Sequence, residues 1–354
     1  MPDFDFDERR LEQYLRAHVE GFRGPVSVSR FAGGQSNPTY LLATPAQEYV
    51  LRRKPPGQLL ASAHAVDREY RVISALSAHT AVPVPRTYCL CTDESVIGTW
   101  FYVMERIRGR TFADTSFPEV PRAQRAGYFD AMNAVLAALH GVDAASIGLA
   151  DYGKPSDYVR RQIARWSGQY REDEIAGRVP AMDRLIEWLV RSVPAVDETA
   201  IVHGDFRCDN LMFDATQPRV IAILDWELST LGHPLADFGY HVMMYRLPPT
   251  AVTALGGVDL QALNIPSEEE YVAAYCARTG RASIPDLDFF VIYNMFKMAA
   301  ICHGIRGRLA RGTAASSRAQ EYANSVERIA EVAWAEVEKS AARAGGPAVS
   351  ADLS

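Results

Sequence analysis

The chain has 354 residues, of which 48% are hydrophobic and 23% charged, and its formal net charge at pH 7 is −6. This length favours two packed lobes over a single core, and the composition is that of a globular protein. The negative net charge argues against a nucleic-acid-binding protein, and the five scattered cysteines indicate neither a disulfide framework nor a zinc site.

The N-terminal segment is acidic and has no apolar centre, so it does not have the pattern of a secretory signal. No apolar run reaches the roughly 18 residues that a membrane-spanning helix needs. We therefore expect a soluble, cytoplasmic protein that binds neither membrane nor nucleic acid. Whether it forms a homodimer is left open by the sequence.

The first hundred residues read as a sheet with one long internal helix. Leu11, Leu15 and Val19 recur at helical spacing near the N-terminus, before the first predicted strand. The predicted helices are 7–20 and 64–78, and the predicted strands are 26–31, 39–43, 49–53, 86–92 and 100–106. The first three strands have the spacing of an antiparallel meander.

After Gly109 the pattern becomes mainly helical, with one β-rich island. The predicted helices are 122–142, 156–175, 181–192, 235–246, 268–279, 286–309 and 316–342, and the island has strands at 199–202, 211–213 and 220–224. The fold class is thus α+β. We expect a β-rich lobe at 1–104, a hinge at 105–110, a helical lobe at 111–342 and a flexible tail at 343–354.

The island concentrates the residues that phosphoryl transfer needs. Asp205 and Asn210 have the spacing D-x-x-x-x-N, and Asp225 ends the apolar strand Ile223-Leu224. Asp205 would accept or orient the proton of the nucleophile, while Asn210 and Asp225 offer the oxygen ligands that Mg²⁺ prefers. Each residue alone reads as a turn former, but the joint pattern favours a kinase site. His203 is expected to brace the loop.

These segments resemble the aminoglycoside phosphotransferase and choline kinase-like superfamily, which shares the protein-kinase-like fold. The resemblance rests on HGDFRCDN at 203–210, ILDWE at 223–227 and LGHPLADFGY at 231–240. The segments RRKPPGQLL and AHAVDREYRVI are similar to the subgroup found fused to acyl-CoA dehydrogenases. The resemblance covers residues 25 to 340. It implies a protein of two lobes that uses ATP and Mg²⁺.

The resemblance also implies a nucleotide site in the first lobe. The loop Gly33-Gly34-Gln35-Ser36-Asn37 is similar to the loop that covers the phosphates, although a plain hairpin turn is the alternative. Arg52 stands where the family has a phosphate-binding lysine, with Lys54 as the second candidate. Glu69 would hold this cation, unless it faces solvent. The carbonyl of Glu105 and the amide of Ile107 would bind adenine.

Two further roles follow from the catalytic loop. Arg207 lies two residues after Asp205, and we expect it to contact the γ-phosphate; the alternative is a salt bridge to Asp209. In the family, the residue at the position of Asp237 braces this loop.

The sequence leaves the phosphate acceptor unnamed. The three acids at 268–270 follow Ser267 and are explained by a helix start. Basic residues at 297, 303, 306 and 308 would suit an anionic acceptor, such as a hydroxyacyl-CoA or another hydroxylated metabolite, over an antibiotic. The predicted function is Mg²⁺-dependent transfer of the γ-phosphoryl group of ATP to a small-molecule hydroxyl. The alternative is an ATP-binding module without transfer.

Overall fold

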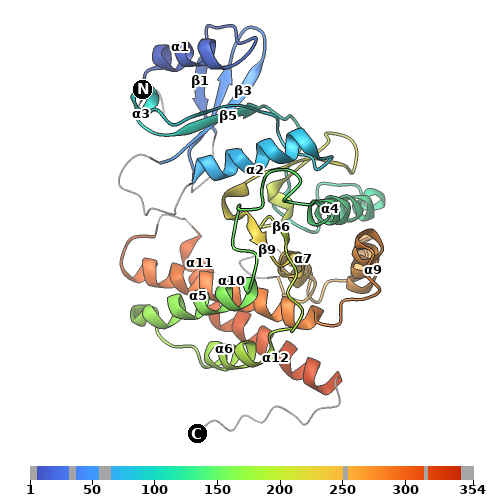
Figure 1. Cartoon of the computed structure of the whole chain (residues 1–354). Coiled ribbons are helices and arrows are strands. Elements are labelled where there is room, and N and C mark those ends of the chain that lie inside the picture. The colour runs from blue at the N-terminus through green and yellow to red at the C-terminus, as the bar shows by residue number, and fades with distance from the viewer. Residues whose placement is uncertain (1–5, 32–36, 56–64, 250–253, 315–317, 344–354) are drawn as a thin grey trace. The chain divides into compact units, whose positions relative to one another are not determined.

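The computed structural model describes residues 6–31, 37–55, 65–249, 254–314 and 318–343 (Figure 1). They fall into two compact units. Unit 1 comprises Met1–Thr111, Val142–Tyr152 and Asn210–Ser229, and unit 2 comprises Phe112–Gly141, Gly153–Asp209 and Thr230–Ser354. The predicted β-rich lobe lies within unit 1, and two later segments of the chain join it. The predicted hinge and tail stay predictions.

Unit 1 is built on a five-stranded antiparallel sheet. Its strands are β1 (Ser27–Arg30), β2 (Thr39–Ala43), β3 (Glu48–Arg53), β4 (Thr87–Cys91) and β5 (Phe101–Glu105), in the order β1-β2-β3-β5-β4. On the central strand, Arg52 is opposite Thr39 of β2 and Tyr102 of β5. These strands confirm the predicted sheet to within one or two residues at each end.

A helix covers each face of this sheet (Figure 1). Helix α1 (Glu8–His18) buries Leu11 and Leu15 in a core with Tyr49 and Leu51 of β3. Because side chains alternate along a strand, Val50 and Arg52 point to the other face. Helix α2 (Val66–His79) packs there and buries Glu69 among apolar residues. A short helix α3 (Glu94–Ile97), capped by Asp93, had no clear periodicity in the sequence.

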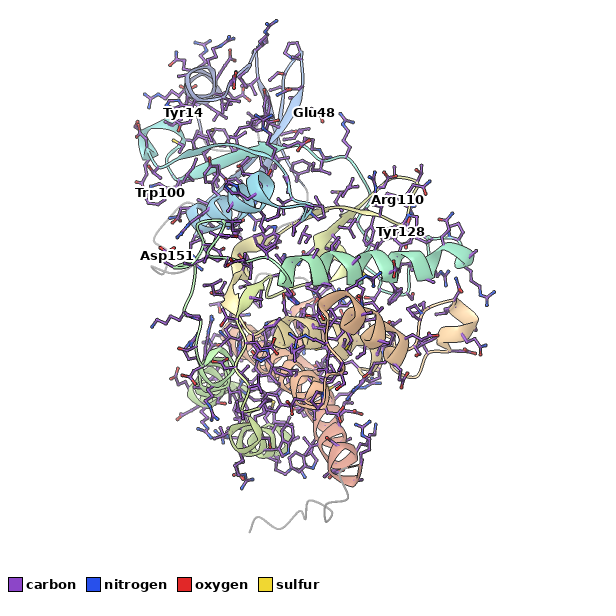
Figure 2. All side chains as sticks on the ribbon, turned by 45° about the vertical axis from the view of Figure 1, so that its right-hand side comes forward. Tyr14, Glu48, Trp100, Arg110, Tyr128 and Asp151 are labelled. Carbon is purple, nitrogen blue, oxygen red and sulfur yellow. The ribbon has the colours of Figure 1, made fainter. Side chains whose placement is uncertain are left out.

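The hairpin of β7 (Leu211–Phe213) and β8 (Val220–Ile223) belongs to unit 1. Arg110 and Phe213 exchange two backbone hydrogen bonds of 2.8 Å, which tie the hairpin to the chain after β5. A 3₁₀ turn η4 (Trp226–Leu228) follows Asp225. The segment 142–152 contacts α2, since Arg71 of that helix forms an ion pair with Asp151. Asp151 is labelled in Figure 2.

Unit 2 is mainly helical. Its helices are α4 (Arg125–His140), α5 (Tyr158–Glu172), α6 (Pro180–Ser192), α7 (Pro234–Val242), α8 (Leu260–Leu263), α9 (Glu268–Thr279), α10 (Leu287–Ala310), α11 (Ala319–Ala323) and α12 (Val326–Arg343). The 3₁₀ turns are η1 (Arg122–Gln124), η2 (Glu174–Ala176), η3 (Cys208–Asn210), which runs into unit 1, and η5 (Met243–Tyr245). Two short strands, β6 (Ala200–Val202) and β9 (Thr230–Gly232), pair antiparallel.

Helix α10 forms the centre of unit 2 and packs against α5, α6, α7, α11 and α12 (Figure 1). Its residues are buried on nearly every side, as expected of an interior helix. The aromatic and methionine side chains between Phe289 and Met298 are therefore core. At the start of α9, Ser267 and Glu270 form a capping box, which confirms that the acids at 268–270 mark a helix start.

The predicted helix 316–342 is wrong in one respect, because the chain breaks between α11 and α12. Arg306 of α10 donates two hydrogen bonds, of 3.1 and 2.9 Å, to the carbonyl of Ala323. Ser325 donates its hydroxyl to the carbonyl of Glu321. Both carbonyls thus have side-chain partners at the break, which local periodicity does not reveal. The predicted α+β class is confirmed.

All five cysteines are buried and free. Within the described ranges, no helix combines the length and apolar character required to cross a membrane.

Candidate active site

Arg52 lies at the centre of a cluster of charged side chains in unit 1. Its Nε is 3.0 Å from Oε2 of Glu69, and its Nη2 is 2.6 Å from Oδ1 of Asp225 and 3.4 Å from Oε2 of Glu227. The Arg52 side chain is 13% exposed and that of Glu69 is 1% exposed. One guanidinium thus connects the sheet, α2 and the segment after β8.

Burial dominates the electrostatics of this cluster. It raises the pKa of Glu69, although Arg52 and the Tyr102 hydroxyl favour the ionised form. Burial also opposes the charged form of Arg52, but the carboxylates around it, with Glu69 first, raise its pKa. Tyr102 Oη donates to Glu69 Oε2 (3.1 Å), and Asn37 Nδ2 donates to Glu69 Oε1 (2.6 Å). Glu69 is therefore an interior residue, and the solvent-facing alternative is wrong.

The two cations that follow Arg52 lie elsewhere. Arg53 is buried on the opposite face of β3, where its guanidinium lies over the rings of Phe6 and Tyr40. The Lys54 ammonium lies 4.0 Å from the ring centroid of Trp100 and 3.9 Å from Asp67 Oδ1. Of the two candidates for the strand cation, Arg52 is the one that reaches Glu69 and Asp225.

A cavity of about 210 Å³ opens beside this cluster, and its described lining belongs entirely to unit 1. Apolar side chains form most of its wall, including Val50, Ile73, Met104, Met212 and Ile223. Arg52, Glu105, Ile107 and Asp225 also line it. An apolar slot with a few polar groups at its edge is the usual form of a small-ligand site.

The predicted adenine-binding segment lies within the described residues, whereas most of the predicted phosphate-covering loop lies outside them. Glu105 ends β5, and its backbone amide is already bonded to the carbonyl of Arg86 (2.8 Å). Ile107 follows two residues later in the cavity wall. Gly33, Gly34, Gln35 and Ser36 lie outside the described residues. Asn37 is described, and it is buried against Glu69.

The hairpin β7–β8 brings Asn210 and Asp225 to one end. Leu211 pairs with Ile223, and the amide of Leu224 donates to the carbonyl of Asn210 (2.8 Å). Asp225 adopts a φ of 62°, an uncommon conformation that often marks a functional position. In the described ranges, no group of three or more His, Cys, Asp or Glu residues could hold a metal alone. An amide and a carboxylate oxygen do fit Mg²⁺ that is bound together with phosphate.

The predicted catalytic loop, residues 203–210, lies mainly in unit 2, where Asp237 of α7 holds it. Asp237 Oδ2 and Oδ1 accept hydrogen bonds from the backbone amides of His203 (2.7 Å) and Gly204 (2.9 Å). Burial alone would raise the pKa of Asp237, but His140 and the amide of His203 lower it. His203 Nδ1 accepts from the amide of Asp205 (3.3 Å), which agrees with a bracing role.

Asp205 is held by a residue that the sequence reasoning did not single out. The Tyr240 hydroxyl donates to Asp205 Oδ1 at 2.5 Å. Lys297 of α10 donates to the carbonyl of Gly204 at 3.0 Å. Tyr240 is three residues after Asp237, so it shares that helix face, and this spacing could have revealed it. Lys297 is a charge within an otherwise apolar helical run, which signals a buried partner.

Arg207 forms an ion pair with Asp209, with Nε 2.5 Å from Oδ1. Burial opposes the charge of Arg207, but Asp209 and the nearby Tyr240 and Asp205 raise its pKa. This pair is the alternative that the sequence offered. The contact with the γ-phosphate stays a prediction. It requires Arg207 either to leave Asp209 or to bind Asp209 and the phosphate together.

A second cavity, of about 120 Å³, lies in unit 2 next to the catalytic loop. Its apolar wall includes Met243, Met244, Leu247 and Met298. Arg207, Asp209, Tyr240 and Arg318 add polar and charged groups. Among the described residues that line it, Asp209 is the only acid. The cavity therefore offers few carboxylates to a ligand with several positive charges.

Three of the four basic residues of α10 that the sequence singled out are engaged within the protein, and the fourth, Arg308, is exposed. His303 Nε2 is 2.7 Å from the carbonyl of Gly177, and Arg306 forms an ion pair with Glu327. Together with the Lys297 contact, this leaves little support for the expectation that the basic residues of α10 attract an anionic acceptor. Their spacing in sequence did not show which of them face the interior.

Comparison with known proteins gives consistent matches over most of the chain. Acyl-CoA dehydrogenase family member 11 from Gallus gallus is 44% identical over 337 residues, which are 92% of this chain and 43% of that protein. Family member 10 from Mus musculus is 42% identical over 92% of this chain and 30% of that protein. The chain thus spans less than half the length of these curated relatives.

Solved structures agree in fold. A Ralstonia eutropha protein, provisionally described as an aminoglycoside phosphotransferase, is 48% identical, with a TM-score of 0.88 over 95% of this chain and 99% of that one. Choline kinase from Cryptosporidium parvum is 12% identical, with a TM-score of 0.64 over 96% and 97%, and this likeness shows the kinase-like fold. The phosphotransferase enzyme family (APH) matches residues 27–283. The chain therefore belongs to the APH phosphotransferase enzyme family.

Proposed function

We propose that this chain transfers the γ-phosphoryl group of ATP to a hydroxyl of a small molecule, with Mg²⁺. The observation that carries the proposal is the cluster of Arg52, Glu69 and Asp225 beside an apolar cavity. Arg52 lies on a strand, is held by the helix carboxylate of Glu69 and pairs with Asp225. This arrangement suits a bound nucleoside triphosphate. The same chain carries Asp205 five residues before Asn210.

The proposed nucleotide site assigns a role to each side chain around the first cavity. The apolar wall receives adenine, with the carbonyl of Glu105 and the amide of Ile107 as its hydrogen-bond partners. Arg52, oriented by Glu69, contacts the phosphates as a planar fork. Asn210 and Asp225 hold Mg²⁺, which offsets the negative charge of the phosphates. Gly33 to Ser36 cover the phosphates, while Asn37, which is buried against Glu69, holds that carboxylate in place.

The proposed transfer step is a single displacement. The acceptor oxygen forms a bond to the γ-phosphorus while the bond from that phosphorus to the β–γ bridging oxygen breaks, and ADP leaves. Asp205 takes the proton of the acceptor hydroxyl. Arg207 contributes positive charge near the γ-phosphate. Positioning and charge stabilisation account for most of the catalysis in reactions of this kind.

For the acceptor, we propose a hydroxylated metabolite with an apolar chain, such as a hydroxyacyl-CoA, over an aminoglycoside. The methionine-lined cavity beside Tyr240 supports an apolar chain, and its scarcity of acids argues against a molecule with several ammonium groups. The names of the relatives, which contain acyl-CoA dehydrogenase, point in the same direction.

The test is acceptor profiling by mass spectrometry with the purified chain, ATP and Mg²⁺. The panel contains hydroxyacyl-CoAs with the hydroxyl at different carbons, the matched acyl-CoAs without it, free hydroxy acids and aminoglycosides. We expect a gain of one phosphoryl group only on hydroxylated acyl compounds. Transfer to aminoglycosides alone would contradict the acceptor class. Tight ATP binding without transfer to any acceptor would favour a binding module.

A further inference from the structure

Tyr240 presents its hydroxyl to the carboxylate of Asp205 from the last turn of α7. Its side chain is buried, at 7% exposure, and its oxygen is 2.5 Å from Asp205 Oδ1. Burial and the charge of Asp205 raise the pKa of Tyr240 well above its ordinary value. The hydroxyl therefore stays protonated and is the donor of this hydrogen bond.

Lys297 supports the same loop from α10. Its ammonium donates to the carbonyl of Gly204 at 3.0 Å and lies 5.0 Å from the ring centroid of Tyr240. Gly204 has a φ of 85°, which a residue with a Cβ rarely adopts. Lys297 thus fixes the backbone directly before Asp205, while Tyr240 fixes its side chain.

The other charged groups near this pair have partners of their own. Asp237 accepts the amides of His203 and Gly204, and Arg207 pairs with Asp209. Neither contact needs Tyr240 or Lys297. The two residues that restrain Asp205 are therefore separable by mutation from the brace and from the arginine.

We propose that Tyr240 and Lys297 are positioning residues that aim the Asp205 carboxylate at the acceptor hydroxyl. The inference rests on the proposed function, in which Asp205 takes the proton of that hydroxyl. A general base works only within hydrogen-bond reach of its proton, and a misplacement of about 1 Å can cost about a hundredfold in rate. A hydrogen bond to one carboxylate oxygen restricts the rotation of the group and so limits its misplacement.

The kinetic test compares Tyr240→Phe with wild type. We expect kcat to fall about tenfold or more, while the KM for ATP changes less than about twofold, because the nucleotide site is not touched. Lys297→Met should shift kcat in the same direction. The matched control is Tyr245→Phe, since the Tyr245 hydroxyl is buried in the following turn η5 and has no hydrogen-bond partner among the described residues.

A second measurement needs no acceptor. The unfolding equilibrium is measured for wild type, Tyr240→Phe, Asp205→Ala and the double variant. Removing the hydroxyl should raise the unfolding equilibrium constant about tenfold in wild type, because the bond is to a charged group, and much less in the Asp205→Ala background. Equal effects in both backgrounds would show that Tyr240 acts independently of Asp205.

The two measurements separate the inference from the proposed function. If wild type transfers phosphate and Tyr240→Phe has the kcat of Tyr245→Phe, the positioning role is wrong and the function stands. If wild type transfers nothing, the function is wrong, and the unfolding cycle still decides whether Tyr240 restrains Asp205. A lower kcat in Tyr240→Phe with a non-additive cycle supports the inference.

Discussion

The two units hold the carboxylates of the candidate site in different ways. In unit 1, Asp225 and Glu69 are held by charge, since both pair with the Arg52 guanidinium. In unit 2, the carboxylate of Asp205 accepts a hydrogen bond from the neutral hydroxyl of Tyr240, and the loop around it is fixed through backbone amides by Asp237. The first arrangement suits a site that receives a charged ligand, and the second suits a group that must accept a proton.

Replacing Asp205, the proposed proton acceptor of unit 2, has the largest expected effect. Asp205→Asn should lower turnover by about a hundredfold to ten-thousandfold, which is the usual contribution of a general base. ATP affinity should change little, because Asp205 does not line the cavity beside Arg52. Steady-state kinetics and calorimetric ATP binding check both parts. A variant with near-normal turnover would remove Asp205 from the chemistry.

In unit 1, Arg52→Met should weaken ATP binding about a hundredfold, because charge-assisted hydrogen bonds to the phosphates are lost. It should also destabilise the unit, since Glu69 is left buried without its cation. The matched control is Lys54→Met, directly after the end of β3, which should leave ATP affinity unchanged. Weaker binding in Lys54→Met but not in Arg52→Met would transfer the phosphate role to Lys54.

The buried His241 of α7 should make the free energy of unfolding depend on pH. Burial lowers the pKa of His241 to about 4, against about 6.5 in an unfolded chain. The unfolded state therefore binds the proton first, so stability is full above about pH 6.5 and is lost as the pH falls towards 4. Between pH 7.5 and 5, His241 should remove about 2 kcal/mol from the free energy of unfolding.

Urea titrations at both pH values measure this loss. His241→Gln, which cannot be protonated, should lose less stability than wild type between the two values. His18→Gln, which replaces an exposed histidine of α1, is the control and should behave as wild type. An equal loss in His241→Gln and wild type would contradict the assignment.

The smallest expected effect concerns Arg207. Arg207→Ala should reduce turnover about tenfold, because positive charge near the γ-phosphate is lost. Arg219→Ala serves as control, since Arg219 forms a comparable surface pair with Asp214 in the turn between β7 and β8. Unchanged turnover in Arg207→Ala would leave the pair with Asp209 as its whole role.

Much of this fold could be predicted from the sequence. The features that were missed depend on contacts between residues far apart in the chain. Local periodicity predicted α1, α2 and the five-stranded sheet, since each has a regular apolar face, and the long, largely apolar run predicted the interior helix α10. It missed β9, a three-residue strand whose partner β6 is about thirty residues away. It also missed the break after Ala323, where the tertiary contact from Arg306 overrides local pattern.

The candidate site shows the same limit. The motif spacing predicted roles for Asp205, Asn210 and Asp225, which stay predictions, and strand alternation separated Arg52 from Arg53. The support of Asp205 by Tyr240 and Lys297 depends on how α7 and α10 pack beneath the loop. No local rule places a lysine of α10 against a glycine more than ninety residues earlier. Such contacts come only from the tertiary structure.

An isotope label on the γ-phosphoryl group shows directly whether the chain transfers this group from ATP to the acceptor. Wild-type protein is incubated with Mg²⁺, a hydroxyacyl-CoA acceptor and ATP that carries ¹⁸O on the three non-bridging γ-oxygens. We expect the acceptor to gain one phosphoryl group with all three labelled oxygens, and we expect Asp205→Asn to slow this gain by about a hundredfold or more. Label found only in inorganic phosphate, with the acceptor unchanged across the whole panel, would contradict it.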